Sequence, residues 1–145
     1  MASGTDGYAL SSDEGELFTF SGVSVLIKAS TDAFTLWEEL PPLVDTPLHL
    51  HEREDELFMI SEGEHVFQCG EREFEVGPGG FVFLPRQVQH AQRRVVPGEG
   101  RFHVMTVPGG FDGFFRILAD AERAGTLGPG TYAAASEQYG ITWLS

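Results

Sequence analysis

The sequence predicts an all-β protein, an antiparallel sandwich or closed barrel that is followed by one or two C-terminal helices. Between about residues 17 and 107, runs of four to nine residues rich in Phe and Val alternate with Gly or Pro turns at nearly even spacing. Such spacing is typical of antiparallel sandwiches and barrels. After Gly110 the apolar residues change to helical spacing. The 145 residues suit a single domain.

Each predicted strand is bounded by turn residues. Three β-rich runs come first: LFTF (17–20), VSVLI (23–27) and FTLW (34–37). Six more strands are predicted at 57–60, 65–69, 73–76, 81–84, 88–96 and 101–107. The runs LFMI (57–60) and FVFL (81–84) are apolar at every position, so we expect both to be covered on both faces by a double-sheet roll.

Two helices are predicted after the strands. The first spans 111–125, with Asp112 as N-cap and Gly125 as C-cap, and the second spans 131–140, with Thr131 and Gly140 in these roles. We therefore expect three parts: a loose N-terminal arm (1–15), a β-barrel (16–110) and a C-terminal helical segment (111–145). The helical segment is predicted to pack on the barrel or on a partner chain.

Composition excludes several classes of protein. The net charge of −13 disfavours binding to nucleic acid or to an anionic membrane surface. A single cysteine, Cys69, excludes an intramolecular disulfide and a cysteine-based zinc finger. No run approaches the roughly 18 apolar residues of a membrane helix, and the N-terminus has no signal-peptide pattern. These features predict a soluble, cytoplasmic protein.

Two histidines in PLHLHEREDE suggest one half of a metal site, although a solvated polar loop is the alternative. If 47–51 is a strand, His49 and His51 point to the same face with Cβ atoms about 7 Å apart. Two imidazoles so placed can meet one metal at about 2.1 Å from each nitrogen. Glu56 follows five residues later, and His90 lies on a later strand that can face the pair.

Two other motifs carry no such chemistry. His51-Glu52 resembles the start of HExxH, but Asp55 stands where the second histidine is required. The stretch GPGG (77–80) lies between two strands, so we interpret it as a turn and not as a phosphate-binding loop.

The histidine and glutamate pattern resembles the two sequence motifs of the cupin superfamily. The first is His49-x-His51-x4-Glu56-x6-Gly63, and the second is Gly79-x5-Pro85-x4-His90. Three family positions differ, because Leu43 and Gln87 replace glycines and Arg94 replaces an asparagine. The resemblance implies a jelly-roll barrel, a double-stranded β-helix, with His49, His51, Glu56 and His90 holding one divalent transition metal. Such donors suit Fe, Ni, Co, Mn, Cu or Zn.

The C-terminal segment is similar to that of small cupins of the quercetin 2,3-dioxygenase-like group, which often carry PGGF-x-x-FF-x-x-L and a later Tyr-Gly-Ile. This resemblance implies a dioxygenase that acts on a hydroxylated aromatic molecule, flavonol-like or polyketide, with dioxygen as co-substrate. Glu56 would act as ligand, base or both. Two alternatives stay open: a non-oxidative metal-dependent cyclase or isomerase, and a cupin that binds a ligand without catalysis.

Further residues are assigned around the site. His103 is a candidate catalytic base if its strand turns it inward. His65 is expected to be exposed, and Arg86, Arg93 and Arg94 are candidates to orient an anionic substrate. The family and the strand edges of such a roll predict a homodimer. The candidate lining residues of a pocket for a small aromatic substrate are Phe58, Ile60, Phe67, Phe81, Phe83 and Phe114.

Overall fold

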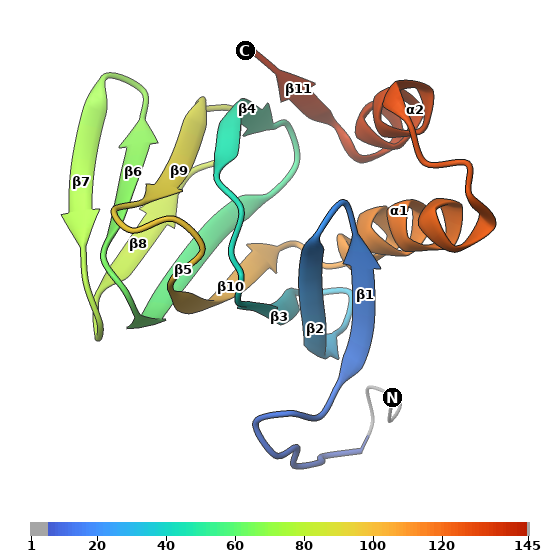
Figure 1. Ribbon diagram of the computed structural model, residues 1–145, viewed down its shortest axis with the longest axis horizontal. Coiled ribbons are helices and arrows are strands. Elements are labelled where there is room, and N and C mark those ends of the chain that lie inside the picture. The colour runs from blue at the N-terminus through green and yellow to red at the C-terminus, as the bar shows by residue number, and fades with distance from the viewer. Residues whose placement is uncertain (1–5, 145) are drawn as a thin grey trace.

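The computed structural model describes residues 6–144, so residues 1–5 of the predicted N-terminal arm lie outside the described residues. Neither helix in this range is long and apolar enough to cross a membrane. The elements, in chain order (Figure 1), are β1 (Glu16–Phe20), β2 (Val23–Ser30), β3 (Thr35–Leu40), β4 (Thr46–His51), β5 (Asp55–Glu62), β6 (His65–Cys69), β7 (Arg72–Val76), β8 (Phe81–Leu84), β9 (His90–Arg94), β10 (Arg101–Val107), α1 (Asp112–Ala124), α2 (Pro129–Tyr139) and β11 (Ile141–Trp143).

The strands form two antiparallel sheets, which confirms the all-β jelly-roll prediction. One sheet has the order β1-β2-β3-β10-β5-β8, and the other has the order β11-β4-β9-β6-β7. The core lies between them: Phe58 of β5 and Phe67 of β6 come from different sheets, and their ring centroids are 4.9 Å apart. Both side chains are buried, and each contributes about 1.5–3 kcal/mol relative to an exposed ring.

The C-terminal helices lie at one end of the barrel, beside the β1–β2 hairpin (Figure 1). The predicted apolar stripe of α1 is buried against this end. Phe115 contacts Phe20 of β1 and Trp37 of β3, with ring centroids 5.8 and 4.9 Å apart. The chain then returns as β11, a short strand that the sequence patterns do not indicate, and pairs with β4.

Two predicted helix starts are wrong, whereas both predicted C-caps are confirmed. Asp112 is the first helical residue and not the N-cap, because its Oδ1 accepts a hydrogen bond from Ser30 (2.9 Å) and no side chain caps α1. The second helix begins at Pro129, two residues before Thr131. Gly125 and Gly140 end the helices in the left-handed conformation, with φ of 73° and 69°.

The expectation that LFMI and FVFL are covered on both faces is also wrong. β8 is an edge strand whose outer face meets solvent, and there Phe81 and Phe83 are 55% and 48% exposed. On the neighbouring strand β5, Met59 pairs with Phe81 and is 38% exposed. The side chains of these strands therefore still alternate between the inner and the outer face of the sheet, although every residue is apolar.

Gln87 occupies a backbone conformation that favours glycine, and it stands where the cupin motif carries a glycine. Its φ is 67°, and its N–H donates to the carbonyl oxygen of His51 at 2.7 Å. A side chain in this region costs on the order of 1 kcal/mol. The turn tolerates this cost because it holds the end of β4 beside the start of β9.

Replacing Gln87 by glycine is therefore expected to raise the free energy of unfolding by roughly 0.5–1 kcal/mol. Urea unfolding measures the change. Gln89, two residues later, has no positive φ, so Gln89→Gly should destabilise the protein by a similar amount. Equal effects of the two substitutions would contradict the assigned backbone conformation.

Candidate metal centre

Three histidine rings meet inside the barrel because two neighbouring strands turn them to one face. His49 and His51 alternate with leucines along β4, and both are buried. β9 pairs antiparallel with β4 and places His90 directly opposite His49, with ring centroids 4.4 Å apart. His51 and His90 have ring centroids 5.6 Å apart.

Glu56 brings a carboxylate to these rings from the other sheet. It lies on β5, and its Oε2 is 3.0 Å from His90 Nε2 and 3.4 Å from His51 Nε2. One ligand atom from each of the four residues lies within 4.8 Å of the others, and all four side chains are buried. The jelly roll thus joins residues 49, 51, 56 and 90 into one cluster.

Outside the cluster, one ring is hydrogen-bonded and a second has a buried carboxylate beside it. His49 Nδ1 donates to the carbonyl oxygen of Pro47 at 2.7 Å, since a carbonyl oxygen can only accept. That bond leaves the lone pair of Nε2 free to bind a metal. On the other side, Glu54 is buried, with its Oε1 3.6 Å from His51 Nδ1. Partners of this kind fix the tautomer and orientation of metal-binding histidines.

The electrostatics keep the carboxylate ionised. Burial alone would raise the pKa of Glu56, but the neighbouring His51 and His90 outweigh burial and lower the pKa to about 2. Burial, with the charge of His90 next in weight, lowers the pKa of His49 to about 4. Burial lowers the pKa of His51, but the neighbouring carboxylates of Glu56 and Glu54 outweigh burial and raise this pKa above its ordinary value. At neutral pH the cluster contains an anionic carboxylate and a neutral His49.

The cluster fits a divalent transition metal. Glu56 Oε2 and His90 Nε2 are buried without a hydrogen-bond partner among the described residues, although they lie 3.0 Å apart. Buried polar atoms without partners are costly, so such a pair fits a site in which both atoms bind a metal. A set of nitrogen donors with one carboxylate oxygen suits the later divalent transition metals better than calcium or magnesium.

The cluster opens into a chamber of about 100 Å³. Its far wall comes from α1 and β11: Phe111 lies against His51 (5.1 Å between ring centroids), and Trp143 lies against His49 (4.9 Å). The C-terminal segment thus closes the metal side of the barrel. The residues that line the chamber are Trp37, Glu39, Thr46, His49, His51, Glu56, Phe58, His90, Gln92, Val104, Phe111, Phe114, Phe115 and Trp143.

Glu39 is a second carboxylate in this chamber, and the sequence reasoning missed it. It follows Thr35 and Trp37 on the inward face of β3, and it accepts no hydrogen bond from a described residue. Burial and then the charge of Glu56 raise the pKa of Glu39 to about 7, while Arg94 acts in the opposite direction. The sequence does contain a signal for it: side chains two residues apart in a strand share a face, so Glu39 lies on the same face as the buried Thr35 and Trp37 of β3.

Several predicted site residues lie elsewhere. His103 is not in the chamber, because β10 turns Phe102, Val104 and Thr106 inward. Its ring is about one-third exposed and lies on the outer face, 3.4 Å from Glu38. His65, expected to be exposed, is fully buried and donates from Nε2 to the carbonyl oxygen of Glu62 at 3.0 Å.

Of the residues predicted to line an aromatic pocket, some lie in the chamber and others do not. Phe58 and Phe114 line the chamber, whereas Ile60 and Phe67 are buried in the core away from it. Phe81 and Phe83 face outward, so they are not chamber residues. Contact between any of these residues and a substrate remains a prediction.

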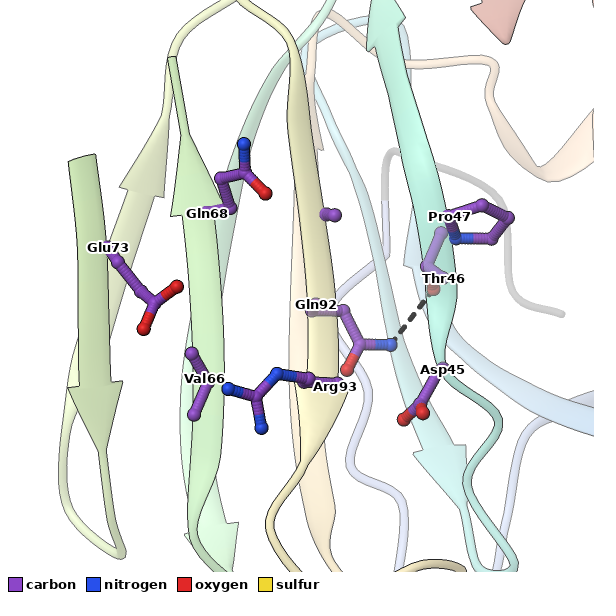
Figure 2. A pocket seen from close by; sticks show the side chains of 9 residues that line it. Asp45, Thr46, Pro47, Val66, Gln68, Glu73, Gln92 and Arg93 are labelled. Atoms are coloured by element: carbon purple, nitrogen blue, oxygen red, sulfur yellow. Dashed lines mark hydrogen bonds between the residues drawn. The ribbon is translucent and has the colours of Figure 1, made fainter. Parts of the chain in front are cut away.

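A larger groove of about 370 Å³ lies on the outside of the five-stranded sheet (Figure 2). It is bordered by exposed polar side chains such as Gln68, Glu73 and Arg93. Figure 2 shows Gln92 reaching from β9 to Thr46 at the edge of β4, where Nε2 donates to Thr46 Oγ1 at 2.9 Å. Among the described residues that line this groove there is no cluster of metal ligands, so the chamber is the stronger candidate site.

Fold and site together define a cupin barrel with a candidate metal site, and sequence comparison supports the cupin assignment. The profile of the family described as "Cupin domain" matches residues 36–108, which contain all four residues of the cluster. The chain belongs to the cupin family. No curated protein matches the chain.

Solved structures show the same fold at low sequence identity. KdgF from Halomonas sp. aligns with a TM-score of 0.65 and 17% identity, over 74% of this chain and 98% of that chain. The cupin domain of Schizosaccharomyces pombe Cnp3 gives 0.58 and 15%, over 84% and 81%. Pac13, a nucleoside dehydratase from Streptomyces, gives 0.58 and 13%, over 74% and 88%. These likenesses establish the architecture alone.

Proposed function

We propose that this cupin is a metal-dependent dioxygenase that acts on a hydroxylated aromatic small molecule. The observation that carries the proposal is the buried cluster of three imidazoles and one carboxylate, which opens into a chamber walled by aromatic rings. His49, His51, Glu56 and His90 would hold the metal. When bound, the metal would supply a Lewis acid that binds and polarises a substrate oxygen.

The chain's own residues would perform three tasks. The hydrogen bond to Pro47 holds the ring of His49, and Glu54 lies 3.6 Å from Nδ1 of His51, so both rings have a neighbour that would orient them before a metal or substrate arrives. Glu56, anionic at neutral pH, would offset the positive charge of the metal and, as a base, would accept a proton from a substrate hydroxyl. Phe111 and Trp143 lie against the imidazoles and would limit the contact of these rings with water.

The experiment that tests this function measures dioxygen uptake. Protein loaded separately with Fe²⁺, Co²⁺, Ni²⁺, Mn²⁺, Cu²⁺ or Zn²⁺ is given quercetin or a simpler phenol, and the product mass is determined. A dioxygenase consumes dioxygen and adds its atoms to the product; with a flavonol, ring cleavage also releases carbon monoxide. Absence of uptake with every phenol and every metal would reject the proposal.

A non-oxidative cyclase or isomerase is the second candidate, and Glu39 is the observation that favours it. A carboxylate with a pKa of about 7 in the same chamber can both give and take a proton near neutral pH. An inward His103 would have offered the same chemistry, but that ring lies outside. Unchanged product mass, or loss of water without dioxygen uptake, would identify this function.

We also propose that the protein is a homodimer joined through the outer face of β5 and β8. Leu57 pairs with Phe83 and Met59 with Phe81, which forms an apolar patch at the edge of the six-stranded sheet. A second copy is the proposed occupant because β8 ends the six-stranded sheet, and its exposed apolar side chains can be covered by the same face of another copy in a two-fold arrangement.

Phe81→Glu with Phe83→Glu is expected to convert the dimer to a monomer in sedimentation equilibrium. Val95→Glu with Val96→Glu, at another exposed apolar pair, is the matched control and should leave the dimer intact. A wild-type protein that sediments as a monomer would contradict the dimer.

A further inference from the structure

The chamber beside the metal cluster is too small to hold a whole aromatic substrate. Its volume is about 100 Å³, whereas sites for small molecules commonly occupy about 300–1,000 Å³. Only the reacting end of a ligand can enter it. The rest of the molecule must lie in a space that adjoins the chamber.

A cleft of about 240 Å³ provides that space. It runs between the β1–β2 hairpin, the segment 42–47 and the C-terminal helices. Together the two cavities fall at the lower end of the size range of ordinary small-molecule sites. The cleft and the chamber share five lining residues: Glu39, Thr46, Phe114, Phe115 and Trp143.

The outer groove of Figure 2 is a poorer route to the metal cluster. Gln92 lines both that groove and the chamber, and it fills the space between β9 and β4. Its amide nitrogen donates to the carbonyl oxygen of Val44 at 3.2 Å and to Thr46 Oγ1 at 2.9 Å. A ligand that entered here would have to break both hydrogen bonds, whereas the cleft leads to the chamber past apolar walls.

The walls of the cleft favour a ligand whose main part is apolar. Many of its side chains are apolar or aromatic, among them Phe20, Leu43 and Tyr132. No lysine or arginine is among the described residues that line the cleft or the chamber. Arg86, Arg93 and Arg94, the candidates to orient an anionic substrate, therefore lie outside the lining of both cavities, and a role for them elsewhere stays a prediction.

Glu39 is the one charged side chain common to both cavities. Asp45, the other acid of the cleft, is paired with the guanidinium of Arg94. Glu39 has no hydrogen bond or ion pair with a described residue, and it is partly exposed at the junction of the two cavities. Its carboxylate oxygens are available to accept a hydrogen bond from a ligand.

We infer that the cleft and the chamber form one site for a neutral hydroxylated aromatic molecule, in which Glu39 accepts a hydrogen bond from a ligand hydroxyl and excludes anions. The inference rests on the proposed function for its ligand class. Glu39 is thus a specificity-determining residue, distinct from the four residues that would hold the metal. A carboxylate acceptor suits a hydroxyl donor, and its negative charge opposes an anion in a site of low dielectric.

Calorimetric titration with two naphthalenes tests the inference. The probes are 2-naphthol, a neutral hydroxyl donor, and 2-naphthoate, an anion of similar shape. Metal-free and Zn²⁺-loaded protein are both titrated at pH 8, because zinc permits binding without redox turnover. We expect the wild type to bind 2-naphthol at least about tenfold more tightly than 2-naphthoate.

Three variants separate Glu39 from the rest of the strand. Glu39→Gln should reduce the preference for 2-naphthol over 2-naphthoate by roughly tenfold. Glu39→Asp keeps the charge and should retain most of the preference. Glu38→Gln alters the next residue, which faces the outside of β3 beside Arg101 and His103, and it should leave the preference unchanged.

The outcomes distinguish this inference from the proposed function. An unchanged preference in Glu39→Gln, or no binding of 2-naphthol by the wild type in either metal state, would overturn the inference whatever the dioxygen assay shows. A preference that depends on Glu39, together with no dioxygen uptake, would support the binding site and reject the dioxygenase.

Discussion

Replacing Glu56 by glutamine is expected to lower the affinity for a divalent transition metal by roughly a hundredfold or more. Glu56 is the one carboxylate in a cluster of three imidazoles, and His51 and His90 lower its pKa to about 2 despite burial, so it is anionic over the working pH range. Glutamine keeps the shape but loses the charge and leaves a weaker oxygen donor. Competition against a chelating dye measures the change.

Glu54→Gln is the matched control for this variant. Glu54 is also buried, but it lies 3.6 Å from the outer nitrogen of His51 and does not belong to the four-residue cluster. Its loss should disturb the orientation of one ligand and lower the metal affinity by roughly tenfold. Equal effects of the two substitutions would show that Glu56 does not bind the metal directly.

Glu39→Gln is expected to stabilise the metal-free protein at pH 8 by on the order of 2 kcal/mol. Burial and the charge of Glu56 raise the pKa of Glu39 from 4.5 to about 7 in the folded state. Below pH 4.5 the group is protonated in both states and contributes nothing to the pH dependence. Between pH 4.5 and 7 the unfolded chain releases the proton first, so the free energy of unfolding falls as pH rises. Above pH 7 Glu39 is ionised in both states, and the folded protein bears the full cost of the buried charge.

The substitution should therefore have its full effect above pH 7 and lose it progressively as pH falls toward 4.5. Urea unfolding at pH 5 and pH 8, in buffer with a chelator, gives the two free energies. Glu38→Gln serves as a control of opposite sign, because Glu38 has partners: Arg101 lies 3.1 Å away and His103 lies 3.4 Å away. A Glu39→Gln protein that is less stable than wild type at pH 8 would show that Glu39 has a stabilising partner.

The strands were predictable because Gly and Pro turns mark their ends, but the facing of apolar strands was not. In FVFL every residue is apolar, so the period-2 pattern that normally separates inside from outside is absent. Only the folded sheet shows that Phe81 and Phe83 face outward, while Val82 and Leu84 face the core. Buried His65 escaped prediction for a related reason, since its hydrogen bond to Glu62 is visible only in the folded turn.

The four-residue cluster was the most predictable part of the site, because its spacing resembles a family motif. His49 and His51 share a face by strand alternation alone, whereas the approach of Glu56 and His90 depends on the barrel. The inward position of Glu39 was within reach of the period-2 pattern of β3 but was missed, whereas the position of Trp143 was not predictable. Trp143 reaches His49 only because β11 pairs with β4, and the three residues of β11 carry no pattern of their own.

The metal content of the purified protein tests the site most directly. Elemental analysis of wild type, His49→Ala and His90→Ala, each before and after loading, should find about one transition metal per wild-type chain and a loss of that metal in both variants. Wild-type protein that binds no metal even after loading, or variants that keep a full complement, would contradict the metal centre at His49, His51, Glu56 and His90.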